Sequence, residues 1–433
     1  MNVLKPYLQQ NKTELANYLA SRAYEIRPET LIATSEILED VRQNKDQALK
    51  KYTKRFDGIA LEQFRVAQEV IEQQAKKADP FFVQALKEAA QNITFYHQKQ
   101  KRKGYRLDGE DGVYLGQMIF PLESVGIYVP GGRALYPSSV LMNAIPAKIA
   151  GVKRIVMTTP PNADGLLAPN LAAAAIVAGV SEIYTVGGAQ AIAALAYGTQ
   201  SIQPVDKIVG PGNTYVAAAK KLVYGKVDID MIAGPSEILV IADEHANPAF
   251  VAADLLSQAE HDPLACSILI STDQNMIDAV NVELRKQTEQ LPKKEIIEQS
   301  LANYGTSILA NSIEDAIAIA NEVAPEHLEL QVQNADQYRT LCRNAGSIFL
   351  GYTTCESIGD YFGGTNHVLP TSQTARFSSP LSVDDFVKKS SYLYYSQEAL
   401  VKHGQKIVKM AQEENLDAHA NAIAIRLNQY ETK

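Results

Sequence analysis

The sequence has no tryptophan, only three cysteines and no apolar run of membrane-spanning length. Cys266, Cys342 and Cys355 are well separated, so they suggest neither zinc-ribbon ligand pairs nor a disulfide framework. The N-terminal residues also lack the apolar core of a signal peptide. These absences argue against a membrane-spanning or disulfide-stabilised protein and predict one of the reducing cytoplasm.

The charge balance argues against a second group of functions. The 433 residues carry a formal net charge of −8, which disfavours nucleic acid or an anionic membrane as a partner. With 46% hydrophobic and 21% charged residues, the composition is that of an ordinary globular protein, long enough for two or three domains. Two motifs are also missing: the GxGxxG dinucleotide fingerprint and the HExxH helix of zinc hydrolases.

The pattern of apolar segments changes near Val113. Residues from about 1 to 110 predict mostly polar helices, whereas short apolar strands alternate with alanine-rich helices afterwards. Strands are predicted at 124–129, 154–158, 182–186, 207–209, near 238, and at 267–271, 307–310 and 347–350. Continuous apolar strands that alternate with helices indicate parallel, doubly wound sheets, and therefore an α/β fold.

Polar side chains gather on the predicted helix that begins at Asn247 and Pro248. Asp254, Gln258 and His261 share one face of it because they are spaced i, i+4 and i+7. That face borders the apolar stripe that would pack on a sheet, which suggests a metal or polar ligand site. The alternative is that His261 interacts with the end of the helix and Gln258 is merely exposed.

Glu326 and His327 lie between a predicted helix and a predicted strand, after Pro325. In such a turn two adjacent side chains can point into one cleft, whereas in a regular strand they would face opposite ways. A carboxylate beside an imidazole is a ready acid–base pair. The alternative is an exposed pair in a loop.

Three further polar residues are candidates for a site. Asp360 follows the strand at 347–350 and is predicted to lie in a loop beyond its carboxyl end, where open α/β sheets bind ligands; an aspartate there can also simply form a turn. Glu414 and His419 lie near the start of a C-terminal helix, which can equally be a solvated one. Gln258, His261, Asp360 and His419 together would offer nitrogen and oxygen ligands without a thiolate, a set that suits zinc and also admits manganese or cobalt.

Several predicted strands end in glycine-rich turns that lead into helices. Gly131-Gly132, Gly187-Gly188 and Gly210-Pro211-Gly212 would direct backbone N–H groups and a helix N-terminus toward an anion. Tight turns need glycine for steric reasons as well, so these turns alone are a weak indication of a cofactor.

Several long tracts, in order, resemble the histidinol dehydrogenase family. They are VGIYVPGGRALYPSSVLMNAIPAKIAG, YTVGGAQAIAALAYGT, KIVGPGNTYVAAAKKLVYG, DMIAGPSEILVIAD, DLLSQAEHD, APEHLEL, GTNHVLPT, TARFSSPLSVDDF and ENLDAHANAI. The resemblance covers almost the whole chain, and ordered tracts of this length are far more specific than a single motif. It implies an NAD-dependent enzyme that oxidises L-histidinol to L-histidine through L-histidinal, with two NAD⁺ and one bound zinc per subunit, in the last steps of histidine biosynthesis.

The resemblance also implies roles for individual residues. The acid–base pair falls on Glu326 and His327. The zinc ligands fall on Gln258, His261, Asp360 and His419. Substrate contacts fall on Ser236, Gln258, His261, His327, Asp360, Glu414 and His419, and NAD contacts on Tyr128, Gln190 and Asn213. The family is a homodimer whose C-terminal segment completes the partner's site.

On this basis we expect two Rossmann-like doubly wound domains with small helical N-terminal and C-terminal extensions. The expected boundaries are 1–25 for the N-terminal helical extension, 26–127 with 236–380 for the domain carrying zinc and the acid–base pair, 128–235 for the NAD domain, and 381–433 for the C-terminal extension. The rival readings are a related enzyme that oxidises another polar alcohol, a zinc hydrolase and a non-enzymatic nucleotide-binding module. Catalysis by a cysteine is not expected, because nothing in the sequence near the three thiols suggests a lowered pKa.

Overall fold

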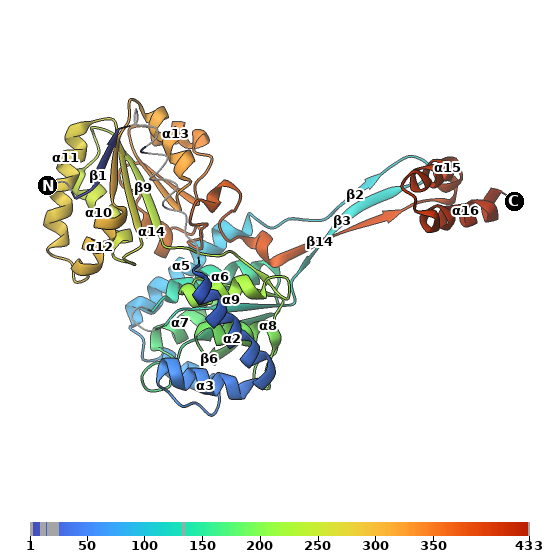
Figure 1. Cartoon of the computed structure of the whole chain (residues 1–433), viewed down its shortest axis with the longest axis horizontal. Coiled ribbons are helices and arrows are strands. Elements are labelled where there is room, and N and C mark those ends of the chain that lie inside the picture. Colours follow the sequence, from blue (N-terminus) through green and yellow to red (C-terminus); the bar gives the residue numbers. More distant parts are fainter. Residues whose placement is uncertain (1–2, 9–13, 15–25, 132–134, 432–433) are drawn as a thin grey trace. The chain divides into compact units, whose positions relative to one another are not determined.

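The computed structural model describes residues 3–8, 14, 26–131 and 135–431. The chain forms two compact units, one of Met1–Gln100 with Glu123–Phe386 and one of Lys101–Leu122 with Val387–Lys433. Figure 1 shows the helices and strands of each unit. Among the described residues, no helix combines the length and the apolar character needed to cross a bilayer.

A five-stranded parallel sheet lies in the first unit, with strand order β6-β5-β4-β7-β8. Its strands are β4 (Ser124–Tyr128), β5 (Arg154–Thr159), β6 (Glu182–Thr185), β7 (Lys207–Val209) and β8 (Asp228–Ile229). They alternate with α6 (Pro137–Ala150), α7 (Pro169–Ala178), α8 (Gly188–Tyr197) and α9 (Thr214–Val223). The predicted strand–helix alternation is confirmed, because runs of buried apolar residues form the strands and alanine-rich helices cover them.

A second parallel sheet, of six strands, has the order β1-β11-β10-β9-β12-β13. Its strands are β1 (Lys5–Leu8), β9 (Glu237–Ala242), β10 (Cys266–Ser271), β11 (Thr306–Leu309), β12 (His327–Gln331) and β13 (Ser347–Leu350). Its helices are α10 (Pro248–Ala259), α11 (Gln274–Thr288), α12 (Lys294–Tyr304), α13 (Ile313–Val323) and α14 (Glu356–Tyr361). Alternate residues of β9 enter two different apolar clusters, so the sheet is buried on both faces. The predicted α/β class is therefore confirmed.

Residues up to about 100 do not follow the expected domain boundaries. Lys5–Leu8 is an edge strand paired with β11 rather than helix, and most of the rest of the expected extension 1–25 lies outside the described residues. Residues 26–100, expected to join the zinc domain, contain α2 (Pro28–Asn44), α3 (Asp46–Asp57), α4 (Gln68–Ala75) and α5 (Pro80–Gln98). These helices pack on α6, α7, α8 and α9 of the five-stranded sheet, and apolar residues of α2 and α3 join its core.

The second unit combines segments that were expected in different domains. β2 (Tyr105–Asp108), β3 (Tyr114–Pro121) and β14 (Val387–Tyr394) form an antiparallel sheet, so 101–122 does not belong to an α/β domain. The expected helical C-terminal extension contains a hairpin of α15 (Gln397–Glu413) and α16 (Asp417–Glu431). The chain turns at Asn415, whose φ is 58°, a left-handed value that asparagine tolerates.

A buried ion pair fixes the turn after β7. Lys220 on α9 contacts Asp230 and donates to the carbonyl of Gly210 at 2.9 Å, and Asp230 accepts the N–H of Gly210 at 2.8 Å. Both side chains are almost fully buried. The pair therefore holds the backbone that leads into Asn213.

We expect Lys220→Met to lower the free energy of unfolding by about 3–5 kcal/mol, because Asp230 would remain buried without its cation. Urea denaturation measures the change. Lys221→Met, at an exposed neighbour on α9, is the control and should have little effect. Equal losses for the two variants would contradict a special role for the buried pair.

Candidate active site

A pocket of about 360 Å³ in the first unit contains most of the residues expected from the sequence. Residues that follow strands of the five-stranded sheet line one side, among them Pro130, Asn213 and Thr214. The other side lies at the amino ends of β9 and β12, where Ser236 and His327 are found. The remaining lining residues that matter for chemistry are Gln258, His261, Glu326, Asp360 and His367.

The position of Asp360 differs from the expected loop beyond a carboxyl strand end. Asp360 lies in the last turn of α14, which follows the carboxyl end of β13. The helix carries Asp360 back to the amino edge of the six-stranded sheet, where its Oδ1 is 3.7 Å from Nε2 of His327. The sequence pattern missed this helix because it has only six residues.

Glu326 and His327 are both buried and both line the pocket. His327 is the first residue of β12 rather than part of the turn, and its Nδ1 lies 3.0 Å from the carbonyl oxygen of Glu237 and 3.7 Å from Oε2 of Glu326. The backbone N–H of Glu237 donates to Oε2 of Glu326 at 2.9 Å. The start of β9 therefore fixes both members of the pair.

Burial and the charges of neighbouring groups shift the pKa values of both Glu326 and His327. Burial raises the pKa of Glu326 to about 8. Burial alone would lower the pKa of His327, but the carboxylates of Glu326 and Asp360 outweigh it and raise that pKa to about 10. The pair is therefore arranged to hold and exchange a proton close to any molecule in the pocket.

Three of the four expected metal ligands lie around this pocket: Gln258, His261 and Asp360. The Oε1 atom of Gln258 and the Nε2 atom of His327 are buried and have no hydrogen-bond partner among the described residues. An unsatisfied amide oxygen beside a carboxylate and two imidazoles suits a cation with nitrogen and oxygen ligands, so the residues fit zinc. Ligand atoms of His327, Glu356 and Asp360 also lie within 4.8 Å of one another, which makes Glu356 a further candidate.

Glu414 and His419 belong to the second unit, where Glu414 follows α15 and His419 lies in the first turn of α16. Both are exposed. The first unit by itself therefore brings together three of the four expected ligands.

The three residues expected to contact NAD lie at or just beyond carboxyl strand ends of the five-stranded sheet. Tyr128 ends β4, and its hydroxyl accepts the N–H of Gly188 at 3.0 Å. Gln190 lies in the first turn of α8, is buried, and neither atom of its amide has a partner among the described residues. Asn213 caps α9 by accepting the N–H groups of Tyr215 and Val216. This edge of a parallel sheet is where nucleotides bind.

His367 and Glu356 are not among the site residues expected from the sequence. His367 lines the pocket, with Nδ1 2.9 Å from the carbonyl oxygen of Asp360 and Nε2 3.1 Å from the hydroxyl of Ser139. The one available signal for Glu356 was its spacing of four residues from Asp360, which places both on one face of a helix. His97 is fully buried on α5.

A buried carboxylate network supports α14 behind the pocket. Glu329 accepts the N–H of Glu356 at 2.8 Å, and Gln331 donates to Glu329 at 3.0 Å and to Asp254 at 2.6 Å. Asp254 thus faces this network and is not among the pocket-lining residues, although it shares a helix face with Gln258. Burial, together with the nearby Asp254, holds the pKa of Glu329 well above its ordinary value. The network continues to Ser257, whose hydroxyl donates a hydrogen bond to the carboxylate of Glu356 at 2.6 Å.

The cysteines are not part of the site. None of the three is among the residues that line the pocket. Burial raises the pKa of Cys342 to about 11 and also raises that of Cys355, so neither is an activated thiolate.

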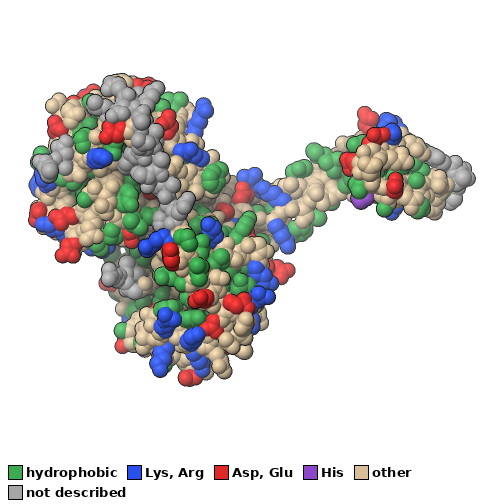
Figure 2. Space-filling model, in the orientation of Figure 1, with side chains coloured by type: hydrophobic (Ala, Val, Ile, Leu, Met, Phe, Trp, Pro, Cys, Tyr) green, Lys and Arg blue, Asp and Glu red, His purple; other side chains and the backbone are tan. Residues whose placement is uncertain are grey.

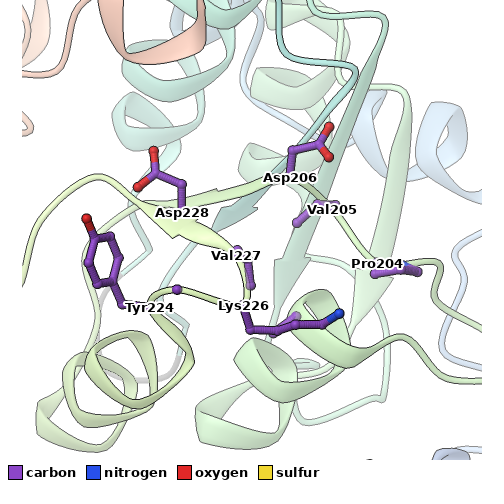
Figure 3. Close-up of a pocket in the computed structure, with 9 residues that line it drawn as sticks. Pro204, Val205, Asp206, Tyr224, Lys226, Val227 and Asp228 are labelled. Atoms are coloured by element: carbon purple, nitrogen blue, oxygen red, sulfur yellow. The ribbon is translucent and has the colours of Figure 1, made fainter. Parts of the chain in front are cut away.

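A larger pocket, of about 540 Å³, lies elsewhere in the first unit, next to β7 and β8 (Figure 3). Its charged side chains, Asp206, Lys226 and Asp228, point in different directions and do not converge on one point. None of the residues expected from the sequence lines it.

Two parallel sheets covered by helices, and a pocket that gathers a buried carboxyl–imidazole pair with further nitrogen and oxygen side chains, are features of an α/β enzyme. The sequence profile of the histidinol dehydrogenase family matches residues 21–427. The chain is 57% identical over 390 residues to histidinol dehydrogenase of Clostridium acetobutylicum, which covers 90% of each chain. It is 56% identical over 393 residues to the Listeria innocua enzyme, which covers 91% of this chain and 92% of that one.

A crystal structure of histidinol dehydrogenase from Elizabethkingia anophelis agrees with the fold, with a TM-score of 0.94 and 41% identity over 100% of this chain and 99% of that one. The chain therefore belongs to the histidinol dehydrogenase family and is an NAD-dependent oxidoreductase.

We expect Glu329→Leu to lower the free energy of unfolding by about 1–3 kcal/mol, because the N–H of Glu356 and the amide of Gln331 would lose their acceptor. Glu329→Gln is the matched control, since it keeps an acceptor oxygen at the position of the carboxyl group. It should cost clearly less in the same denaturation experiment. Equal losses for the two variants would show that this hydrogen bonding does not support α14.

Proposed function

We propose that the protein catalyses the zinc-dependent oxidation of L-histidinol to L-histidine through L-histidinal, a four-electron reaction that uses two NAD⁺ in the last steps of histidine biosynthesis. The observation that carries this proposal is the single pocket where the buried pair Glu326 and His327 lies beside Gln258, His261 and Asp360. Family membership supports the choice of substrate.

His327 is the general base in this proposal; it takes the proton in its neutral form, which its raised pKa makes strongly basic but a minor fraction at neutral pH. A carbinol carbon loses hydride readily only when its hydroxyl proton is also removed, and an imidazole held at the pocket wall suits that role. NAD⁺ supplies the hydride acceptor. Glu237 fixes the imidazole through the contact between its carbonyl oxygen and Nδ1, which leaves Nε2 directed to the pocket side where Asp360 lies.

Glu326 is the proposed base for the second oxidation. The aldehyde must be hydrated before a second hydride can leave, so a water molecule has to lose a proton. Glu326 is buried next to His327, and its raised pKa makes it a stronger base than an exposed carboxylate. His327 assists in this step.

Zinc would be held by Gln258, His261, Asp360 and His419 of the partner subunit, and when bound it would orient the imidazole and amine of the substrate. The proposed substrate contacts are Ser236, Gln258, His261, His327, Asp360, Glu414 and His419. The proposed NAD contacts are Tyr128, Gln190 and Asn213.

A homodimer with shared sites is the proposed assembly. Glu414 and His419 are exposed on a unit separate from the pocket-bearing one, and that unit exposes large apolar side chains on its sheet and helices (Figure 2). They include Tyr105, Leu107, Phe120, Leu393, Met410 and Ile425. Such a surface supports burial against another subunit. Three free cysteines fit the reducing cytoplasm as the compartment.

The reaction itself is tested by following NADH formation with histidinol, with and without a chelator. We expect two NADH per histidinol, and activity that is lost with the chelator and restored by zinc. His261→Asn should lower the zinc content measured by mass spectrometry, whereas His245→Asn, at an exposed histidine, should not. Higher activity on other amino alcohols would favour the related-enzyme reading, and NAD⁺-independent hydrolysis would favour a hydrolase.

We expect Glu326→Gln to spare alcohol oxidation and to slow aldehyde oxidation about a hundredfold or more, because an amide cannot take a proton from water. Single-turnover assays that start from histidinol and from histidinal separate the two steps. Equal impairment of both steps would contradict this division of roles.

Co-expression of His261→Asn and His419→Asn chains tests the shared site. Random pairing makes half of the dimers mixed, and each mixed dimer would contain one intact site, so activity should recover to about one quarter of wild type. Each variant alone should be nearly inactive. No recovery on mixing would place His419 in its own subunit's site.

A further inference from the structure

Asp57 carries a carboxyl group that the fold does not explain. It is the last residue of α3, and its Oδ2 is buried without a hydrogen-bond partner among the described residues. A carboxylate at this position faces the negative end of the helix dipole. Burial also raises the pKa of Asp57 to about 6, so its ionised form is unfavourable yet predominates at neutral pH. A group kept at such a cost to stability is typical of a binding site.

The chain after Asp57 shows where this carboxyl group lies. Phe64 accepts the N–H of Thr185 at 2.9 Å, and Val66 donates to Ile183 at 2.9 Å, so this segment runs antiparallel to β6. Residues before Phe64 therefore continue beyond the carboxyl end of β6. α3 packs on α8, which begins at that same end. Asp57 thus lies at the nucleotide-binding edge of the sheet.

The amide of Gln190, at the same edge, is also left without a partner among the described residues. The charge of Asp57 acts on the hydroxyl of Tyr128, whose pKa is raised to about 12 by burial and, to a smaller extent, by Asp57. Tyr128 accepts the N–H of Gly188. The amide of Gln190 lies against Gly188, since a Cβ atom added to Gly188 would be only 2.7 Å from Oε1 of Gln190. This oxygen is buried and has no hydrogen-bond partner among the described residues. An unpartnered carboxylate oxygen and an unpartnered amide at the same edge of a sheet suit a ligand with several hydroxyl groups.

We propose that the carboxylate of Asp57 accepts a hydrogen bond from a ribose hydroxyl of NAD⁺ and selects NAD⁺ over NADP⁺. This inference rests on the NAD contacts proposed above for Tyr128 and Gln190. A carboxylate binds a ribose diol as an acceptor and repels a 2′-phosphate. Asp57 is therefore a specificity-determining residue that takes no part in proton transfer.

The experiment measures steady-state kinetics with saturating histidinol and with NAD⁺ or NADP⁺ varied. Asp57→Asn is expected to raise KM for NAD⁺ about ten- to a hundredfold, the effect of losing one charge-assisted hydrogen bond, with kcat little changed. The ratio of kcat/KM for NADP⁺ to that for NAD⁺ is expected to rise about tenfold or more. Asp57→Glu, which keeps the charge, should retain the preference for NAD⁺.

Two controls separate a loss of the Asp57 contact from a general effect of charge and from a loss of folding. Glu62→Gln removes an exposed carboxylate that pairs with Lys50 and should change neither KM nor cofactor preference. Thermal unfolding of Asp57→Asn should occur at the wild-type temperature or above, because the variant removes an unpartnered buried charge. If this variant unfolds below the assay temperature, Asp57→Ser replaces it in the kinetic comparison.

Two results would overturn the inference, and they differ in whether the proposed NAD site fails as well. If Tyr128→Phe or Gln190→Ala raises KM for NAD⁺ while Asp57→Asn leaves both KM and cofactor preference unchanged, Asp57 does not contact the cofactor and the proposed NAD site stands. If none of these variants alters KM for NAD⁺, the cofactor binds elsewhere and the proposed NAD contacts fail together with the role of Asp57.

Discussion

The burial of charged groups at the amino edge of the six-stranded sheet is the constraint on which the site depends. Glu326 and His327 have little access to water, so the protein must provide their partners. It does so with the backbone of Glu237 at the start of β9 and with Asp360 on α14. Any displacement of either element would leave a buried charge without a partner. The two strands and the short helix are therefore constrained by the same few contacts.

The pocket combines two different edges of parallel sheets. Its five-stranded side uses carboxyl strand ends, with exposed N–H groups and helix N-termini, which suits a nucleotide. Its six-stranded side uses amino strand ends, where acid–base and metal-ligand types of side chain gather. An oxidoreductase needs both kinds of surface next to each other, because the hydride acceptor and the base must reach the same carbon atom.

Much of the first unit could be predicted from the sequence. The strands Lys207–Val209 and Ser347–Leu350 have the predicted ends, because apolar runs and the adjacent glycines agree there. The helix α14 could not be predicted, because six residues are too few for a period to be visible. The pairing of 101–122 with 387–394 was not predictable either, since two segments that far apart pair by edge hydrogen bonds that leave no local signal. Residue types indicated Gln258, His261 and Asp360 as polar candidates, whereas Asp57 and His367 became visible only through their surroundings.

The ion pair of Lys220 and Asp230 has a consequence for the turn that leads into Asn213. Counterions screen pairs in contact with solvent, such as Lys50 with Glu62, but they cannot reach a pair enclosed by protein atoms. The Gly210-Pro211-Gly212 backbone should accordingly keep its conformation in concentrated salt. Ionic strength would then affect the approach of charged molecules to this edge of the sheet while leaving the shape of the edge itself unaltered.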